Sequence, residues 1–146
     1  MEELANQTVL VLGLGVSGRS AATFCAEHGA RVTAADERTP EALAPLELPA
    51  SVETILGKPL PDPAAFDLVV PSPGIPPSRY ASRAKQVWGD VELAARNLQV
   101  PVVAVTGTNG KSTTVLLTQA MLCAAGVSTN TCFPDWHARI ASHACQ

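Results

Sequence analysis

Short runs of aliphatic and β-branched residues recur along the chain, and each run predicts a β-strand. The runs are Thr8–Leu12, Arg31–Ala35, Phe66–Val70 and Val100–Val105. The first is apolar or β-branched throughout, which is typical of a strand buried on both faces of a parallel sheet. Between the first two runs, Arg19–His28 has a helical pattern that stops at Gly29. This βαβ order predicts an α/β fold with a Rossmann-like parallel sheet.

The segments between the predicted strands differ in character. Six of the 12 prolines lie in Thr39–Pro63, so we expect only short elements and loops there, at the sheet's edge. Helices are predicted over Arg79–Val87, where Ser78 is a candidate cap, and over Val91–Asn97. A further helix is predicted from Lys111 to about Ala125, before Gly126.

These patterns predict three parts of the chain. Residues 1–97 form an α/β domain, and residues 98–127 are the truncated start of a second domain. The tail, 128–146, holds two of the four Cys, two of the three His and one of the two Trp, and no aliphatic strand run. That break in composition suggests a frame change or gene truncation near Val127.

Composition and charge exclude several classes of protein. The net charge is −3, which argues against a nucleic-acid partner, and a hydrophobic fraction of 47% indicates a globular chain. No apolar run approaches the roughly 18 to 20 residues that cross a bilayer, and no secretory signal is visible. The four cysteines lack the spacing of a disulfide framework. We expect a cytoplasmic protein without membrane insertion.

A glycine loop, Gly13-x-Gly15-x-x-Gly18, lies between the first predicted strand and its helix. Such glycines allow a tight turn, a close approach of the backbone to phosphate and close packing of helix on strand. Asp36 ends the next strand, where a carboxylate can accept hydrogen bonds from a nucleotide. The loop therefore predicts a nucleotide or dinucleotide site; the alternative is a purely structural turn.

A second loop joins the strand predicted at Val100–Val105 to the last helix. Backbone N–H groups of such a loop hold phosphates, its Lys reaches the β- and γ-phosphates, and its Ser can bind Mg²⁺. The strict P-loop pattern fails, because Val105 stands where its first glycine belongs, so this is a shortened variant. It predicts a triphosphate site, against a surface loop with a solvated lysine, formed by Gly107, Thr108, Asn109, Gly110, Lys111, Ser112 and Thr113.

A third candidate, Ser72-Pro73-Gly74, follows the strand Phe66–Val70. Open α/β sheets bind ligands at the carboxyl ends of their strands. The alternative here is a rigid proline turn.

Two phosphate loops about 90 residues apart resemble the N-terminal part of the Mur ligases, the ATP-dependent amide ligases of peptidoglycan synthesis. The resemblance covers about residues 7–127 and is closest to the members that add D-glutamate, with the alanine-adding members second. It rests on Gly13–Gly18, Asp36-Glu37-Arg38, Ser72-Pro73-Gly74-Ile75, Gly89-Asp90-Val91-Glu92-Leu93 and Val105–Thr113.

The resemblance implies a role for each loop. In a UDP-binding domain over residues 1–97, the diphosphate would meet Gly15, Val16 and Ser17. The same pocket would include Asp36, Glu37 and Arg38 around the uracil, and Ser72, Pro73 and Gly74. In the ATP-binding domain, Lys111 would be the catalytic residue that neutralises the transferred phosphoryl group. Ser112 would bind Mg²⁺, supported by Thr113.

The resemblance also implies the reaction. UDP-N-acetylmuramoyl-L-alanine is phosphorylated by ATP to an acyl phosphate, and the amine of D-glutamate attacks it. Only 33 residues follow Thr113, so we expect this chain to lack the rest of the ATP-binding domain and an amino-acid-binding domain. We therefore expect a monomer that has no ligase turnover by itself. Two alternatives stay open: a non-catalytic nucleotide-binding fragment, and an NAD-dependent dehydrogenase fragment that leaves the second loop unexplained.

Overall fold

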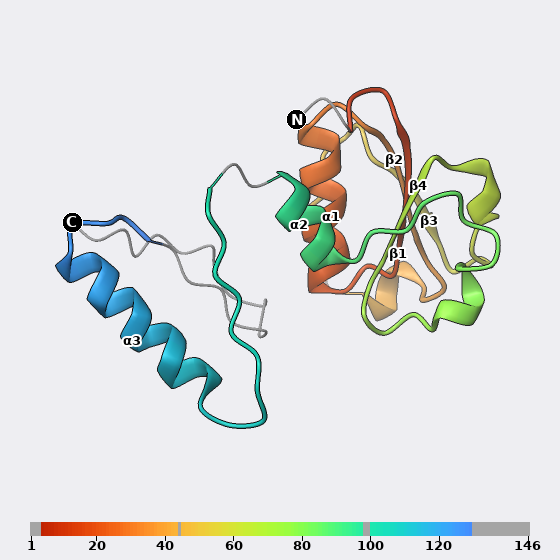
Figure 1. The fold of residues 1–146 in the computed structure, drawn as a ribbon. Helices are drawn as coiled ribbons and strands as arrows, with labels where there is room; N and C mark the ends of the chain where they lie inside the picture. The colour runs from red at the N-terminus through yellow and green to blue at the C-terminus, as the bar shows by residue number, and fades with distance from the viewer. Residues whose placement is uncertain (1–3, 44, 98–99, 130–146) are drawn as a thin grey trace. The chain divides into compact units, whose positions relative to one another are not determined.

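The computed structural model describes residues 4–43, 45–97 and 100–129 of the chain. The chain divides into two compact units, Met1–Gln99 and Val100–Gln146 (Figure 1). Each unit is described by itself. Of the predicted tail, 128–146, the residues beyond Thr129 lie outside the described residues, and the suggested frame change near Val127 stays a prediction.

The first unit is built on one parallel sheet. Its strands are β1 (Thr8–Leu12), β2 (Arg31–Asp36), β3 (Glu53–Leu56) and β4 (Leu68–Pro71). Their order across the sheet is β3-β2-β1-β4, and every pairing is parallel. The two strands with the longest apolar runs, β1 and β4, pair in the register Val9↔Leu68 through Leu12↔Pro71. The α/β fold with a Rossmann-like sheet is confirmed, since this order matches the first four strands of the 3-2-1-4-5-6 arrangement of that fold.

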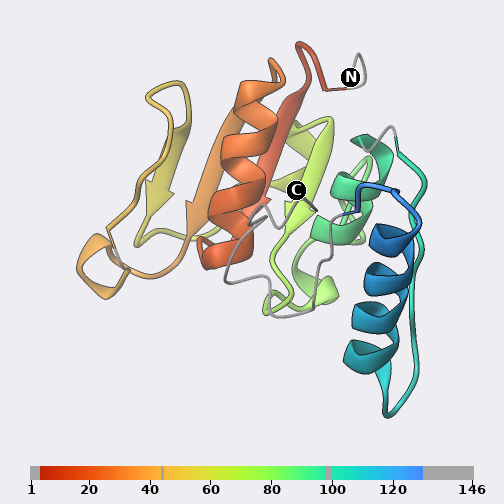
Figure 2. The same ribbon diagram turned by 90° about the vertical axis from the view of Figure 1, so that its left-hand side faces the viewer.

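Two helices cover one face of the sheet: α1 (Val16–Glu27) and α2 (Asp90–Asn97). Figure 2 shows α1 lying against the sheet, with β3 at one edge and β4 at the other. Side chains alternate along β1, so Val9 and Val11 enter the core under the helices. Trp88 and Leu93 close that core near α2, and both are buried.

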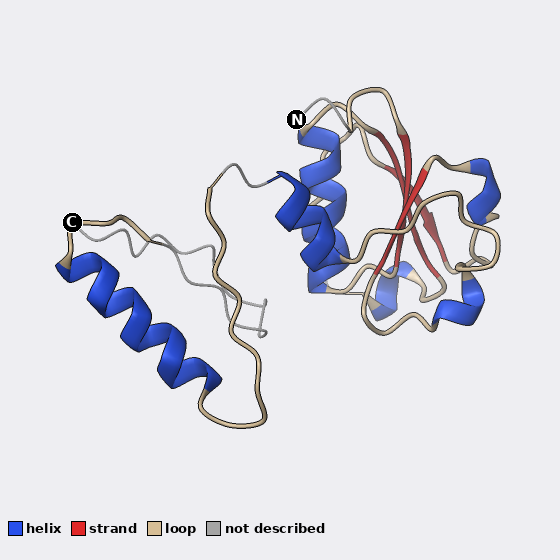
Figure 3. Cartoon of the chain, in the orientation of Figure 1, coloured by secondary structure: helices blue, strands red, loops and turns tan. Residues whose placement is uncertain are grey.

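The opposite face has its own smaller core. Leu10 and Leu12 of β1 pack there with Val69 and Tyr80, and all four are buried. Turns and short 3₁₀ segments cover this face, including η2 (Pro63–Ala65) and η3 (Pro77–Arg79), as Figure 3 shows by secondary structure. Because both faces are covered, β1 is buried along Val9–Leu12, as its apolar run predicted.

One predicted helix, Arg79–Val87, is wrong. Only η3 forms at its start, and the chain then returns beside β4, where Val87 bridges Val69. The Val69 N–H donates to the Gln86 carbonyl at 2.9 Å, and the Trp88 N–H donates to the Val69 carbonyl at 3.0 Å. A helix would leave these buried groups of Val69 unpaired, so tertiary pairing overrides local preference.

The proline-rich segment forms short elements, as expected. It contains η1 (Pro40–Ala42) and β3, the edge strand of the sheet. The strand β3 was not predicted, because two of its four residues are exposed and no apolar run marks it. The helix α1 begins at Val16, three residues before its predicted start, so the glycine loop leads directly into its first turn.

The second unit holds one helix among its described residues, α3 (Lys111–Ala124). The strand predicted at Val100–Val105 is absent: this segment is extended but unpaired, and the exposed fraction of Val103 is 72%. A strand needs a neighbour for its backbone groups, and none is present in the described part of this unit. The described part of α3 buries no residue.

Candidate functional site

The three loops that follow β1, β2 and β4 meet where these parallel strands have their carboxyl ends. We call this side of the sheet the carboxyl edge. It is formed by the glycine loop Gly13–Ser17, by Glu37 and Arg38, and by Ser72–Gly74. The chain runs from β1 to β2 and β3 on one side of β1 and returns from β3 to β4 on its other side, so the carboxyl edge lies at a topological switch point. Ligands of open α/β sheets bind in the crevice at such a point.

The glycine loop presents the start of α1 to this edge. Gly15 is the N-cap residue of α1, and no side chain caps the helix. The first N–H groups of a helix have no intrahelical partner and carry a partial positive charge. Val16 and Ser17, the first residues of α1, therefore offer backbone donors to an anion.

Gly18 fixes how closely α1 approaches the loop. A Cβ atom at this position would lie 1.8 Å from the Gly13 carbonyl oxygen and 2.8 Å from Ser72 Oγ. No side chain fits there without moving backbone. At Gly15 the same test finds nothing within 4 Å, so the space beside this residue is open. Gly18 is thus required by packing, whereas Gly15 faces open space.

Asp36 ends β2 and is buried, with 5% of its surface exposed. Its Oδ2 accepts the Leu14 N–H at 2.7 Å and Arg38 Nη2 at 2.6 Å; its Oδ1 accepts the Arg38 N–H and Nε, both at 2.9 Å. The Arg38 side chain and the two backbone donors outweigh burial and lower the pKa of Asp36 to about 2. The carboxylate is therefore charged throughout the neutral range.

Ser72 reaches the glycine loop from the other side. Its Oγ donates to the Gly13 carbonyl at 2.7 Å, and its N–H donates to the Leu12 carbonyl at 2.8 Å. Pro73 and Gly74 follow in a turn, in which the Ile75 N–H donates to the Ser72 carbonyl. Both residues are exposed. The structure thus brings Ser72 and Asp36 to the same loop from two strands.

An ion pair spans the carboxyl edge between Glu37 and Arg79. Arg79 Nη2 lies 2.7 Å from Glu37 Oε1, and Nη1 lies 3.1 Å from Oε2. The hydrogen bonds from Arg79 lower the pKa of Glu37, and this pairing raises the pKa of Arg79. Sequence reasoning missed Arg79 because it was assigned to a helix. Leu14 was also missed, since its backbone N–H carries the contact and no side-chain pattern marks it.

In the second unit, a loop of residues 107–110 leads into α3. Gly110 is the N-cap residue of α3 with φ +79°, which a residue with a side chain adopts only with strain. Lys111 Nζ folds back onto the loop and donates to the Gly107 carbonyl at 2.5 Å and the Thr108 carbonyl at 3.4 Å. Asn109, Ser112 and Thr113 are exposed on the same loop and first helical turn.

This loop fits a bound phosphate by its geometry. The N-terminus of α3 has no side-chain cap, so its N–H groups are open to an anion. The Lys111 ammonium lies beside this N-terminus and donates to two loop carbonyls, from which it could turn to the anion. No cluster of three or more His, Cys, Asp or Glu that could hold a metal occurs in the described residues. A cation bound at this loop would have the Ser112 hydroxyl and the phosphate oxygens as its ligands.

A shallow surface hollow of about 470 Å³ lies along the outer side of α1. It is lined by Val16, Arg19, Ser20, Thr23, Phe24, Glu27, Pro45 and Glu47. It touches the glycine loop only at Val16, and Asp36 and Ser72 do not line it. Within the parts of the chain that are described, no helix has the length and apolar character needed to span a membrane.

The strand order and the glycine loop define an α/β domain with a Rossmann-like parallel sheet. Residues 7–89, more than half of the chain, match the family model of the Mur ligase MurD-like N-terminal domain. The chain therefore belongs to this Mur ligase family, and the resemblance found in the sequence is confirmed.

The relatives in this family are much longer than the chain. The UDP-N-acetylmuramoylalanine–D-glutamate ligase of Anaeromyxobacter dehalogenans is 52% identical over 82% of this chain and 28% of its own length. That of Myxococcus xanthus is 47% identical over 79% of the chain and 28% of its length. That of Geobacter metallireducens is 44% identical over 87% and 30%. The chain thus spans less than a third of these relatives.

A solved structure shares the fold. It is a pseudomurein peptide ligase type C from Methanothermus fervidus, with a TM-score of 0.53 and 23% identity. The match covers 86% of this chain and 28% of that protein. At this identity the likeness supports the α/β architecture.

Proposed function

We propose that this chain is the nucleotide-binding part of a ligase that adds D-glutamate to UDP-N-acetylmuramoyl-L-alanine. The observation that carries this proposal is the family match over residues 7–89, together with relatives of that name at 44% to 52% identity. The carboxyl edge supports it, because an uncapped helix start and a glycine loop suit a diphosphate. The second loop supports an ATP site.

In this proposal, residues 1–97 bind the UDP portion of the substrate. The N–H groups of Val16 and Ser17, beside the open space at Gly15, would face the diphosphate. The uracil end would lie near Glu37 and Arg38, with Pro73 and Gly74 on the other side. Asp36 and Ser72 would border the same site, since both donate to or accept from the glycine loop.

Residues 98–127 would begin the ATP-binding domain. The loop Gly107–Gly110 would surround the phosphates, with Lys111 turned from the loop carbonyls to the transferred phosphoryl group. Ser112 would hold Mg²⁺ together with phosphate oxygens, and Thr113 would support this position. Mg²⁺, when bound, neutralises charge that builds up on the phosphates.

The proposed reaction belongs to the whole protein. A carboxylate oxygen of the substrate's alanine attacks the γ-phosphorus of ATP, and ADP leaves. The amine of D-glutamate then attacks the acyl carbon, the C–O bond to phosphate breaks, and an amide and phosphate result. Positioning and charge neutralisation supply the catalysis. The expected monomeric state and cytoplasmic location remain predictions.

The contacts of Asp36 favour this function over an NAD-dependent dehydrogenase. In a dehydrogenase of this fold, the acidic residue after β2 accepts hydrogen bonds from the ribose. Here the Asp36 carboxylate already accepts four, from Leu14 and Arg38. A ribose hydroxyl would have to displace one of them.

The test is a calorimetric titration of the full 146-residue chain with UDP, ATP and NAD. It is followed by an assay for ADP release in the presence of UDP-N-acetylmuramoyl-L-alanine, ATP, Mg²⁺ and D-glutamate. We expect UDP to bind weakly, NAD not to compete with it, and no D-glutamate-dependent turnover, because the described second unit offers only one helix and an unpaired segment. Binding of NAD in place of UDP would overturn the assignment. Turnover by the pure chain would show that nothing essential to catalysis is missing.

A further inference from the structure

The segment that follows β4 crosses one face of the sheet with η3 as its one short helical turn (Figure 3). We propose that residues 76–85 form an electrostatic strap, which lies over this face because three exposed ion pairs hold it there. The strap opens locally as ionic strength rises, while the rest of the first unit stays folded. This inference goes beyond the proposed function and does not depend on it.

The backbone of the strap is not fastened to the sheet by hydrogen bonds among the described residues. The first backbone bond to the sheet comes after the strap, where the Val69 N–H donates to the Gln86 carbonyl at 2.9 Å. Within the strap, backbone N–H groups donate to carbonyls of the strap itself. The donors are Arg79, Tyr80, Ala81, Arg83 and Ala84, and the acceptors are Pro76, Pro77 and Tyr80.

The strap also places little apolar surface on the sheet. Tyr80 is 9% exposed and packs with Leu10, Leu12 and Val69 in the smaller core. Ala84 is partly buried against the same core. All other residues of the strap are exposed. Apolar contact therefore fixes the strap mainly at one side chain.

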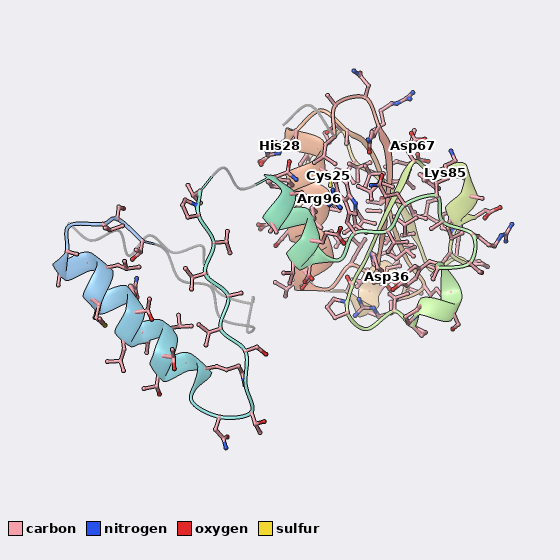
Figure 4. The ribbon with its side chains drawn as sticks, in the orientation of Figure 1. Cys25, His28, Asp36, Asp67, Lys85 and Arg96 are labelled. Atoms are coloured by element: carbon pink, nitrogen blue, oxygen red, sulfur yellow. The ribbon has the colours of Figure 1, made fainter. Side chains whose placement is uncertain are left out.

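Every charged side chain of the strap forms an ion pair with a carboxylate outside it. The three carboxylates come from different segments of the first unit: one follows β2, one caps η2 and one directly precedes β4. The strap is thus held along its whole length. Figure 4 labels one of the pairs, Asp67 and Lys85. The three pairs are Arg79–Glu37 at 2.7 Å, Arg83–Asp62 at 2.6 Å and Lys85–Asp67 at 3.3 Å.

These ion pairs are open to the solvent, with side chains between 42% and 64% exposed. Salt screens charges in such positions far more than it affects a buried apolar core. Local preference does not replace the pairs, because residues 79–87 have a helical pattern that the strap does not follow. Raised ionic strength therefore loosens the strap before it loosens the sheet.

Opening of the strap changes two parts of the first unit. It uncovers the apolar side chains of Leu10, Leu12 and Val69, which Tyr80 covers in the closed state. It also frees Glu37, whose pair with Arg79 spans the carboxyl edge. Ionic strength thus controls access to one face of the sheet and to the Glu37 side of that edge.

Tyr80 is the only tyrosine of the chain, so nitration of its ring reports the strap directly. Tetranitromethane, which is uncharged, is added to the full chain at constant pH in about 10 mM and in about 1 M NaCl, between which the Debye length falls from about 30 Å to about 3 Å. Mass spectrometry gives the nitration rate of Tyr80. We expect the rate to rise at least about threefold at high salt, because three exposed pairs are screened together.

Charge variants show whether the ion pairs are the cause. Arg83→Gln combined with Lys85→Gln removes two pairs, so at low salt Tyr80 should react nearly as fast as in the wild type at high salt. Arg83→Asp alone should also raise the rate, and adding Asp62→Arg should lower it again, because the pair is restored in reverse.

Arg96→Gln is the matched control. Arg96 forms an exposed ion pair of the same kind, with Glu92 at 2.8 Å, but within α2. Loss of this pair should leave the nitration rate of Tyr80 and its dependence on salt as in the wild type. Amide exchange over residues 8–12, in β1, is followed in the same samples and should not change with salt.

Three results would overturn the proposal. The first is a nitration rate of Tyr80 that is the same at both salt concentrations. The second is an equal rise in Arg96→Gln and in the strap variant, which would mean that any exposed pair has this effect. The third is faster exchange in β1 together with faster nitration, because the whole unit would then be opening. No nucleotide enters these measurements, so failure of the proposed function would leave their outcome unchanged.

Discussion

At the scale of single residues, two glycines of the same motif differ in whether their surroundings leave room for a side chain. Gly18 lies where α1 crosses the loop, and an added Cβ would overlap the Gly13 carbonyl oxygen at 1.8 Å. Gly15 is the N-cap residue of the same helix, with φ −67°, and a Cβ atom there would meet nothing within 4 Å. The motif has glycine at both positions, but only Gly18 lies in a close contact that excludes a side chain.

Gly18→Ala should lower the free energy of unfolding by about 3 kcal/mol or more, because backbone must move to admit the methyl group. Gly15→Ala is the matched control and should cost less than about 1 kcal/mol, the difference between glycine and alanine at an N-cap. Urea denaturation followed by circular dichroism measures both. Equal losses in the two variants would show that α1 does not approach the loop this closely.

At the scale of elements, α2 packs on the sheet through a core that contains its own Leu93 and the large side chain of Trp88. Trp88 precedes α2 and is 3% exposed in the core under the helices. The guanidinium carbon of Arg96, in the last turn of α2, lies 4.7 Å from the centre of the Trp88 ring, and Glu92 accepts from Arg96 at 2.8 Å. Figure 4 labels Arg96 on this helix.

Trp88→Ala should therefore reduce the free energy of unfolding by about 3–5 kcal/mol, since it empties a core position. Arg96→Ala removes a cation–π contact and an exposed ion pair with Glu92, and should cost about 1 kcal/mol. Chemical denaturation of both variants checks the prediction. A small loss for Trp88→Ala would mean that the Trp88 side chain does not fill the core beside α2.

At the scale of the whole molecule, the two units differ in how much they bury. The first unit has a core on each face of its sheet. In the second unit, large apolar side chains of residues 100–129 remain exposed: Val100, Val102, Val103, Leu116, Leu117, Met121 and Val127. An exposed apolar segment of this kind favours association.

Amide exchange on the full chain should separate the units. Amides of β1 should exchange at the rate of global unfolding, and those of α3 should exchange far faster, because the described part of α3 buries no side chain that would hold the helix in place. Mass spectrometry of proteolytic fragments after deuterium labelling makes this measurement over residues 8–12 and 111–124. Equal protection of both fragments would contradict it, and dilution of the sample distinguishes association of α3 from folding of the single chain.

Much of the first unit was predictable because its strands and first helix are local patterns. The apolar run of β1, the helix that follows the glycine loop, and β2 ending at Asp36 were all predicted from neighbouring residues. The helix at Arg79–Val87 and the strand at Val100–Val105 were wrong for opposite reasons. Pairing with Val69 drew the first segment along β4, whereas the second segment has no paired strand among the described residues.

The candidate site was predictable as a set of loops, since the carboxyl ends of parallel strands share one edge. The contacts of each residue were not. Whether Asp36 accepts the Leu14 N–H depends on how β2 lies beside β1, which no local pattern contains. The same holds for Arg79, which meets Glu37 across 42 residues of sequence.

The sequence by itself determined the α/β class, the two phosphate-type loops and the resemblance to the Mur ligases, because these depend on the order and spacing of residues. The tertiary structure decided the strand order β3-β2-β1-β4, the close packing at Gly18, and the hydrogen bonds that join Asp36 and Ser72 to the glycine loop. The physical reason is that hydrogen bonds and packing are satisfied between segments far apart in the chain. A side chain's partner is therefore fixed only when the strands are in place.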